Sequence, residues 1–250
     1  MEYTFTMNQG EIQYDLFAPC YDAVMEKPGE TVVFIESLIQ KYNPNAKNVL
    51  ELACGTGNIL SGLDNKYTKV GLDNSSKMLA IARKKIPSAE FVHGDMRIFE
   101  LGREYDVILC IFDSINHLIN ISDWEKVFKQ AKKHLSTNGI FIFDINTILK
   151  LKKLSRLASF KQDIDRKKIE IKVTDKDNNV FNWHVNIVQI SKDQNITTHK
   201  IDILEASFSI NQIEKLVADH LTVREIIDIS GKNATSESER VYFVCQKCIM

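Results

Sequence analysis

Proline, glycine and cysteine are all scarce in this chain, and neither sign of charge is in excess. Its 250 residues include 4 prolines, 10 glycines and 5 cysteines, and 32 basic side chains face 33 acidic ones. A protein that grips a nucleic-acid backbone usually has a basic excess or a basic face, so the balance of charge does not favour a nucleic-acid partner. A few cysteines in odd number predict free thiols rather than a disulfide framework.

Long apolar runs are also missing. No run approaches the about 20 residues of a membrane-crossing helix, and residues 1–10 contain no apolar segment of a signal peptide. These features predict a cytoplasmic protein with no membrane partner. Cys245 and Cys248 have metal-ligand spacing, but no second pair accompanies them and a structural zinc ion needs four ligands. The sequence therefore predicts no metal site.

The chain does have a regular alternation of apolar strands and helices up to residue 150. Helices are expected between residues 11 and 43, and the predicted strands lie at 48–53, 68–73, 89–93, 105–112 and 140–144. Strands that read as continuous apolar runs are typical of a parallel sheet covered by helices on both faces. The pattern predicts an α/β fold.

The second half of the chain reads differently. Apolar and polar residues alternate at 169–173, 181–187 and 201–203, with turn residues between these segments. Alternation of apolar and polar residues in segments that are separated by turns predicts antiparallel strands, which would form a meander inserted into the α/β unit. The lysine-rich run at 150–168 is expected to be a solvated helical face or a loop. Closing strands are expected at 221–229 and 240–246.

Two segments have the capping-box pattern that begins many helices. Ser122 is followed three residues later by Glu125, and Ser209 is followed by Gln212. The first pair predicts a helix that ends near residue 135, and the second pair predicts one that ends near residue 220.

A glycine-rich turn follows the strand at 48–53. Gly55 and Gly57 allow the backbone to pass close to a ligand. A dinucleotide site of an NAD-dependent oxidoreductase would need a third glycine at position 60, where Leu60 stands, and no Gly-Lys-Ser/Thr of a P-loop follows. A purely structural turn is the alternative for the two glycines alone.

A cofactor without phosphates suits this turn better. S-adenosylmethionine carries an ammonium, a carboxylate, a ribose diol, an adenine and a sulfonium. Glu51 precedes the glycines, where an acid suits an ammonium and would be awkward beside a pyrophosphate. Asp73 lies 18 residues beyond Gly55, at the end of the next strand, where a carboxylate can accept from both ribose hydroxyls.

Four ordered segments resemble the motifs of class I S-adenosylmethionine-dependent methyltransferases of the small-molecule branch. Residues 51–58 resemble the first motif, 71–79 the second, 93–96 the third and 105–116 the fourth, and 239–244 fit the family's last strand. The resemblance implies a doubly wound, Rossmann-like, seven-stranded and mostly parallel sheet. The implied cofactor is S-adenosyl-L-methionine, with S-adenosyl-L-homocysteine as its product.

The resemblance also implies which residues bind the cofactor. Asp95 would meet the adenine amino group, and Ala53 stands where the family has its first glycine. The expected set is Tyr21, Glu51, Ala53, Cys54, Gly55, Gly57, Asp73, Asn74, Met78, Asp95, Met96 and Phe112. Within this set Cys54 is expected to be a small buried residue rather than a nucleophile.

The acceptor side is expected in the loop after the fourth strand and in the meander. The substrate-binding candidates are Asp113, Ser114, Asn116 and Trp183. His117 is a candidate general base, although a structural histidine is the alternative. Tyr14 and Tyr21, seven residues apart, share a helix face. This face is either core packing or a lid, in which Tyr14 would be a second catalytic candidate.

The chain is therefore predicted to be a single methyltransferase domain over residues 1–250. It would comprise a helical lid at 1–45, a cofactor-binding core at 46–150, a substrate cap at 151–205 and closing elements at 206–250. The expected reaction is transfer of a methyl group to a small molecule, at nitrogen or oxygen rather than carbon, by a monomer or homodimer.

Two alternatives remain open from sequence. The first is a nucleic-acid methyltransferase, although the fourth segment lacks the Asn/Asp-Pro-Pro-Tyr/Phe signature of amino-group DNA methyltransferases. The second is a non-catalytic module that binds S-adenosylmethionine.

Overall fold

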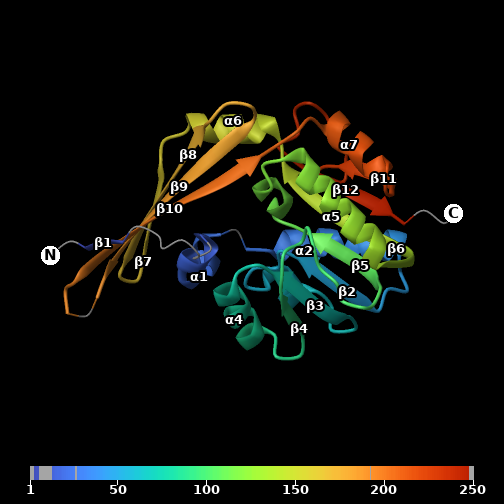
Figure 1. Cartoon of the computed structure of the whole chain (residues 1–250), viewed down its shortest axis with the longest axis horizontal. Coiled ribbons are helices and arrows are strands. Elements are labelled where there is room, and N and C mark those ends of the chain that lie inside the picture. Colours follow the sequence, from blue (N-terminus) through green and yellow to red (C-terminus); the bar gives the residue numbers. More distant parts are fainter. Residues whose placement is uncertain (1–2, 6–12, 26, 192, 248–250) are drawn as a thin grey trace.

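The computed structural model describes residues 3–5, 13–25, 27–191 and 193–247, and these form two sheets (Figure 1). Cys248, and with it the pair with Cys245, lies outside the described residues, as do residues 11 and 12 of the expected first helix. In the described part of the chain, no helix is both long enough and apolar enough to cross a bilayer.

The larger sheet has seven strands in the order β11-β12-β6-β5-β2-β3-β4. The strands are β2 (Asn48–Leu52), β3 (Thr68–Asp73), β4 (Glu90–His93), β5 (Tyr105–Cys110), β6 (Leu135–Asn146), β11 (Thr222–Ile227) and β12 (Arg240–Gln246). Neighbours from β6 to β4 are parallel, whereas β12 is antiparallel to both β6 and β11. The predicted mostly parallel, seven-stranded sheet is confirmed.

Helices cover both faces of this sheet. One face packs against α5 (Ile121–His134) and α7 (Ile210–Ala218), and the other packs against α2 (Gly29–Tyr42), α3 (Asn58–Gly62) and α4 (Ser76–Lys85). Successive strand residues point to opposite faces, so Phe143 joins the first core and Ile142 the second. This explains why the strands read as continuous apolar runs.

The smaller sheet has five strands in the order β1-β10-β9-β8-β7. They are β1 (Tyr3–Phe5), β7 (Phe160–Ile164), β8 (Lys167–Asp175), β9 (Val180–Ile190) and β10 (Ile196–Ala206). Strands β7 to β10 form the antiparallel meander, and β1 pairs with β10 in parallel. In Figure 1 this sheet rises beside the larger one, with α1 (Gln13–Val24) between them, packed against both α4 and β10.

One local prediction was wrong and another was only partly right. Helix α5 begins at Ile121 with Asn120 as its N-cap, so Ser122 lies inside the first turn instead of capping the helix. The lysine-rich run at 150–168 begins as the partly exposed helix α6 (Ile148–Arg156), as expected, but continues into β7, whose strand conformation comes from pairing with β8. The second capping box, Ser209 with Gln212, is confirmed.

A cluster of stacked aromatic rings fills the core beneath α5. Phe143 lies at the centre of it, with ring centroids 4.7 Å from Phe243, 5.1 Å from Phe141 and 5.3 Å from Phe128. All four side chains are fully buried.

Replacing Phe143 by alanine should therefore lower the free energy of unfolding by about 3–5 kcal/mol, because the change leaves a cavity in a close-packed core. Urea unfolding measures this directly. The matched control is Phe160→Ala in β7, where the ring is 53% exposed and the expected change is below about 0.5 kcal/mol. Similar losses in the two variants would contradict this account of the core.

Candidate cofactor and acceptor site

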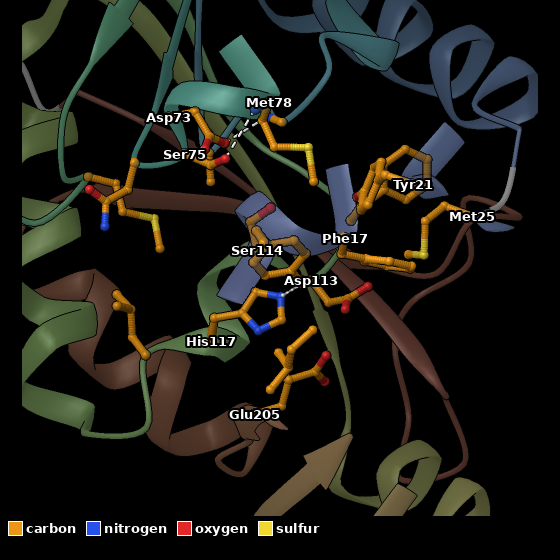
Figure 2. Close-up of a pocket in the computed structure, with 18 of the residues that line it drawn as sticks. Phe17, Tyr21, Met25, Asp73, Ser75, Met78, Asp113, Ser114, His117 and Glu205 are labelled. Carbon is orange, nitrogen blue, oxygen red and sulfur yellow. Dashed lines mark hydrogen bonds between the residues drawn. The ribbon is translucent and has the colours of Figure 1, made fainter. Parts of the chain in front are cut away.

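A cavity of about 310 Å³ lies between the two sheets and beneath α1 (Figure 2). Fourteen of the residues expected from sequence line it: Tyr14, Tyr21, Ala53, Gly55, Asp73, Asn74, Met78, Asp95, Met96, Phe112, Asp113, Ser114, His117 and Trp183. Glu51 and Cys54 line a smaller adjoining space of about 60 Å³. Gly57 and Asn116 line neither of these two cavities.

The glycine-rich turn leaves β2 and enters α3 through left-handed backbone. Gly55 has a φ of 54° and Gly57 a φ of 76°. A Cβ at Gly57 would lie 3.1 Å from the Ile86 side chain, so that glycine is needed for packing behind the site. A Cβ at Gly55 would meet no atom within 4 Å, so the backbone there faces open space. The turn therefore leaves a cradle in which a ligand can approach the main chain.

Ala53 also adopts a left-handed conformation, with a φ of 52°. This conformation costs an L-residue about 1–2 kcal/mol, which explains why glycine is favoured there in the family that the motif resembles. The turn still forms, because the Cys54 N–H donates to the Leu72 carbonyl at 3.0 Å. The Cys54 thiol packs against Gly71, and burial raises its pKa well above the ordinary value. Cys54 is thus a protonated packing residue.

The Asp73 carboxylate at the end of β3 joins two loops. It accepts the Gly55 N–H at 2.7 Å on one oxygen and the Ser75 N–H at 2.7 Å on the other. Burial raises its pKa, although the two N–H groups pull in the opposite direction. Each oxygen keeps acceptor capacity beyond its one backbone bond, so the group suits a ligand with two hydroxyls.

Glu51 is a buried acid with unused hydrogen-bonding capacity. Its side chain is 3% exposed, and its Oε2 has no hydrogen-bond partner among the described residues. Burial raises its pKa well above the ordinary value, and the nearby charge of Asp73 adds to the effect. An unsatisfied buried carboxylate is costly, so a cationic ligand group beside it would be stabilised. The fit to the ammonium of S-adenosylmethionine is good.

Arg97 binds Asp95 at the end of the cavity where the adenine is expected, and the third motif does not include this arginine. The Arg97 Nε lies 3.0 Å from both oxygens of Asp95, and its Nη1 donates to Asp123 at 3.1 Å. Partial burial raises the pKa of Asp95, but the bonds from Arg97 outweigh this and lower it. Arg97 lines the cavity beside Asp95 and fixes the direction of its carboxylate.

Helix α1 covers the cavity and is fastened to both cofactor loops by two aspartates. Asp15 accepts from the Ser75 hydroxyl at the start of α4. Asp22 accepts from Thr56 at 2.5 Å, from Asn58 at 3.0 Å and from Lys85 at 2.7 Å. Sequence reasoning found Tyr14 and Tyr21 but missed these aspartates. The Tyr-Asp dipeptide that recurs after seven residues was the available signal.

Tyr14 and His117 form a hydrogen-bonded pair at the acceptor end of the cavity. The Tyr14 hydroxyl lies 2.9 Å from His117 Nε2, and His117 Nδ1 lies 3.3 Å from the Leu204 carbonyl. A carbonyl only accepts, so Nδ1 carries the hydrogen and Nε2 accepts from Tyr14. Burial lowers the pKa of His117 and raises that of Tyr14 well above its usual range. The pair is therefore a neutral imidazole with a neutral phenol.

Asp113 occupies a strained turn at the end of β5. Phe112 and Asp113 have φ values of 59° and 51°. The Asp113 N–H donates to the Asp144 carboxylate at 3.2 Å, and Arg240 donates to Asp113 Oδ1 at 2.7 Å. Burial raises the pKa of Asp144 to about 6, although Arg240 opposes this. The sequence analysis placed Arg240 and Asp144 in predicted strands and missed their part in the site, because their contacts with Asp113 join residues far apart along the chain.

Asn116 has a different role from the one expected. It is fully buried, and its amide donates to the carbonyls of Asn146 at 3.1 Å and Ala206 at 2.8 Å. Its carbonyl accepts from the Asn146 N–H at 3.0 Å. Asn116 joins the end of β6 to the end of β10 and so aligns the two sheets.

Comparisons with known proteins agree with this site. Residues 49–139 match the family model of a methyltransferase domain. A solved S-adenosylmethionine-dependent methyltransferase from Clostridium acetobutylicum is 26% identical, with a TM-score of 0.81 over 93% of this chain and 98% of that one. Residues 49–139 therefore form a methyltransferase domain, and the chain is similar along most of its length to an S-adenosylmethionine-dependent methyltransferase. This match agrees with the cofactor that the sequence resemblance predicts, S-adenosyl-L-methionine.

Two further proteins that are similar to this chain are named as sugar methyltransferases. The dTDP-3-amino-3,6-dideoxy-alpha-D-glucopyranose N,N-dimethyltransferase of Streptomyces fradiae is 34% identical over 132 residues, 51% of this chain and 52% of that protein. The chain thus matches about half the length of this curated relative. The sugar N-methyltransferase KedS8 of Streptoalloteichus is 18% identical, with a TM-score of 0.78 over 98% of this chain and 96% of that one, which shows a shared fold.

Asp22→Ala should weaken cofactor binding by about tenfold, because it releases one of the two attachments that hold α1 over the cavity. Isothermal titration of S-adenosylhomocysteine measures the effect. Asp219→Ala, at the exposed end of α7, removes the same charge far from the lid and should leave the affinity unchanged. Equal affinities for Asp22→Ala and wild type would argue against α1 as a lid.

His117 should make the folded state less stable in acid. Its folded pKa is lowered, so below the unfolded value of about 6.5 the unfolded chain binds a proton that the folded chain does not. This stability is present above about pH 6.5 and is lost as the pH falls, by at most about 1.4 kcal/mol per pH unit. Urea unfolding of wild type and His117→Gln should show a stability difference that moves against wild type on acidification. A difference independent of pH would refute the assignment.

Proposed function

We propose that this methyltransferase transfers the methyl group of S-adenosylmethionine to a nitrogen or oxygen atom of a small molecule. The observation that carries the proposal is one cavity with two ends and a smaller space beside it. Asp73 and Gly55 form one end, the Tyr14–His117 pair forms the other, and the unsatisfied Glu51 lines the adjoining space.

The residues of the first end would hold the cofactor in a defined way. Asp73 would accept from the ribose hydroxyls, Glu51 would balance the ammonium, and Asp95 would accept from the adenine amino group. The side chains of Met78 and Met96 offer apolar walls in the same cavity. When bound, S-adenosylmethionine supplies a methyl group already activated on a positively charged sulfur.

The protein's main contribution would be alignment and exclusion of water. The acceptor lone pair forms the bond to the methyl carbon, while the electron pair of the broken carbon–sulfur bond stays on sulfur. Helix α1 closes over this path, and an aligned displacement needs little further catalysis. An acceptor N–H or O–H can donate to the Tyr14 oxygen while the Tyr14 hydroxyl donates to His117 Nε2. The neutral imidazole then takes up the proton.

Each segment of the chain has a part in this proposed reaction. We propose that residues 1–45 act as a lid, 46–150 as the cofactor-binding core, 151–205 as a substrate cap and 206–250 as closing elements. The amino-sugar named for the Streptomyces fradiae relative supports an acceptor of similar size. A cytoplasmic location, a monomer or homodimer, and the absence of nucleic-acid and membrane partners belong to the same proposal.

A thermal shift assay tests the cofactor site. S-adenosylhomocysteine at about one hundred times its dissociation constant should stabilise wild type by roughly 2.7 kcal/mol. Asp73→Ala and Gly55→Val should lose most of this shift, because one removes the ribose acceptor and the other fills the open cradle.

Asp219→Asn is the control, because it changes an exposed carboxylate outside the cavity. Its shift should equal that of wild type. If S-adenosylhomocysteine produces no thermal shift in wild type, the proposed function is wrong. If both site variants keep the full shift, the ligand binds at another site.

A further inference from the structure

Glu205 is a buried acid in the cavity wall that cofactor binding does not use. It lies near the end of β10, is 3% exposed and lines the cavity at its acceptor end (Figure 2). Its hydrogen bond from the Asn146 amide is long, at 3.4 Å. Burial raises its pKa well above the ordinary value. A carboxylate in this position is stabilised when a donor of positive charge binds beside it.

Two other polar side chains approach the same point. One oxygen or ring nitrogen atom from each of Asp113, His117 and Glu205 lies within 4.8 Å of the other two. Figure 2 shows these three side chains around one part of the cavity. A group with several N–H donors could therefore reach more than one of them at once.

Charged groups of both signs surround this point. Asp113, Asp144 and Glu205 are the acids, and Arg240 and Lys150 are the bases that interact with them. Arg240 donates to one oxygen of Asp113, whereas the structure shows no ion pair of Glu205 among the described residues. Glu205 is therefore the acid at this point that a cationic ligand group can reach.

The remaining wall near Glu205 is apolar. Ile171, Trp183, Val185 and Ile203 line the cavity from the inner face of β8, β9 and β10. Such a wall suits the carbon skeleton of a ligand and offers nothing to a bare inorganic cation.

We propose that Glu205 is a specificity-determining residue, which binds the acceptor through an ammonium group and makes this enzyme select amines over alcohols of the same shape. The proposal rests on the proposed function, because it places the acceptor beside the methyl group. The ammonium contacts Glu205 and Asp113 and gives up one proton to the Tyr14–His117 pair before the nitrogen attacks. The carbon skeleton lies against Trp183 and its apolar neighbours.

The experiment compares two probes of the same shape on protein saturated with S-adenosylhomocysteine. Cyclohexylamine is an ammonium ion at neutral pH, and cyclohexanol is uncharged. Calorimetry should show that wild type binds the amine roughly 10- to 100-fold more tightly than the alcohol, as expected for hydrogen bonds to a charged group. Glu205→Gln should lose this preference and keep its affinity for cyclohexanol and for S-adenosylhomocysteine.

Two further variants separate charge from fold. Glu205→Asp keeps the charge and should retain part of the preference. Glu170→Gln removes the same charge from β8, where Glu170 is bonded to Ser159 outside the cavity, and should behave as wild type. If Glu170→Gln and Glu205→Gln lose the preference for the amine equally, the preference comes from long-range electrostatic attraction, and the proposal is wrong.

The remaining outcomes distinguish failure of the proposed function from failure of the ammonium proposal. Failure to bind S-adenosylhomocysteine would remove the proposed function itself. If S-adenosylhomocysteine binds but wild type binds the two probes equally, or binds neither, only the ammonium proposal fails. Titration with Mg²⁺, Mn²⁺ and Zn²⁺ completes the test, since a divalent ion that displaces cyclohexylamine and needs Glu205 would make this a metal site instead.

Discussion

The site depends on the two backbone hydrogen bonds that the Asp73 carboxylate accepts. Its two oxygens bind the Gly55 N–H of the loop after β2 and the Ser75 N–H of the turn after β3. One side chain thus fixes both loops at the carboxyl ends of neighbouring parallel strands. Ser75 in turn caps α4 and donates to Asp15 of α1. The cradle, the next helix and the lid are therefore positioned through one hydrogen-bonded chain.

Helix α1 connects this cofactor crevice with the acceptor end. Asp15 and Asp22 fasten it to the crevice, while Tyr14 reaches His117 on the far side. Its apolar side packs with residues of the five-stranded sheet, including Ile169 and Val185. Because one helix contacts both halves, the proposed lid would order the cofactor loops and the acceptor pocket together. A displacement reaction that works by alignment needs this coupling.

The sequence predicted what depends on local pattern. Apolar runs identified the parallel strands, and the positions of Gly55 and Asp73 after neighbouring strands predicted two residues that line one cavity, because neighbours along the chain determine both. It failed where the deciding partner is distant or the local pattern is ambiguous. Arg240 contacts Asp113, which lies 127 positions earlier in the chain. At α5, two polar residues on either side of Ile121 could each be the N-cap, and Asn120 takes this position rather than Ser122.

The two halves of the cavity also differ in how they are encoded. The cofactor half comes from residues 51–96, within the matched methyltransferase domain of residues 49–139. Most of the acceptor wall comes from α1 and from the strands between Ile171 and Glu205, outside that match. A family motif can therefore specify the methyl donor while leaving the acceptor free to change. The proposed role of Glu205 in acceptor choice fits this division, because only the folded chain reveals that this acid is buried in the cavity wall.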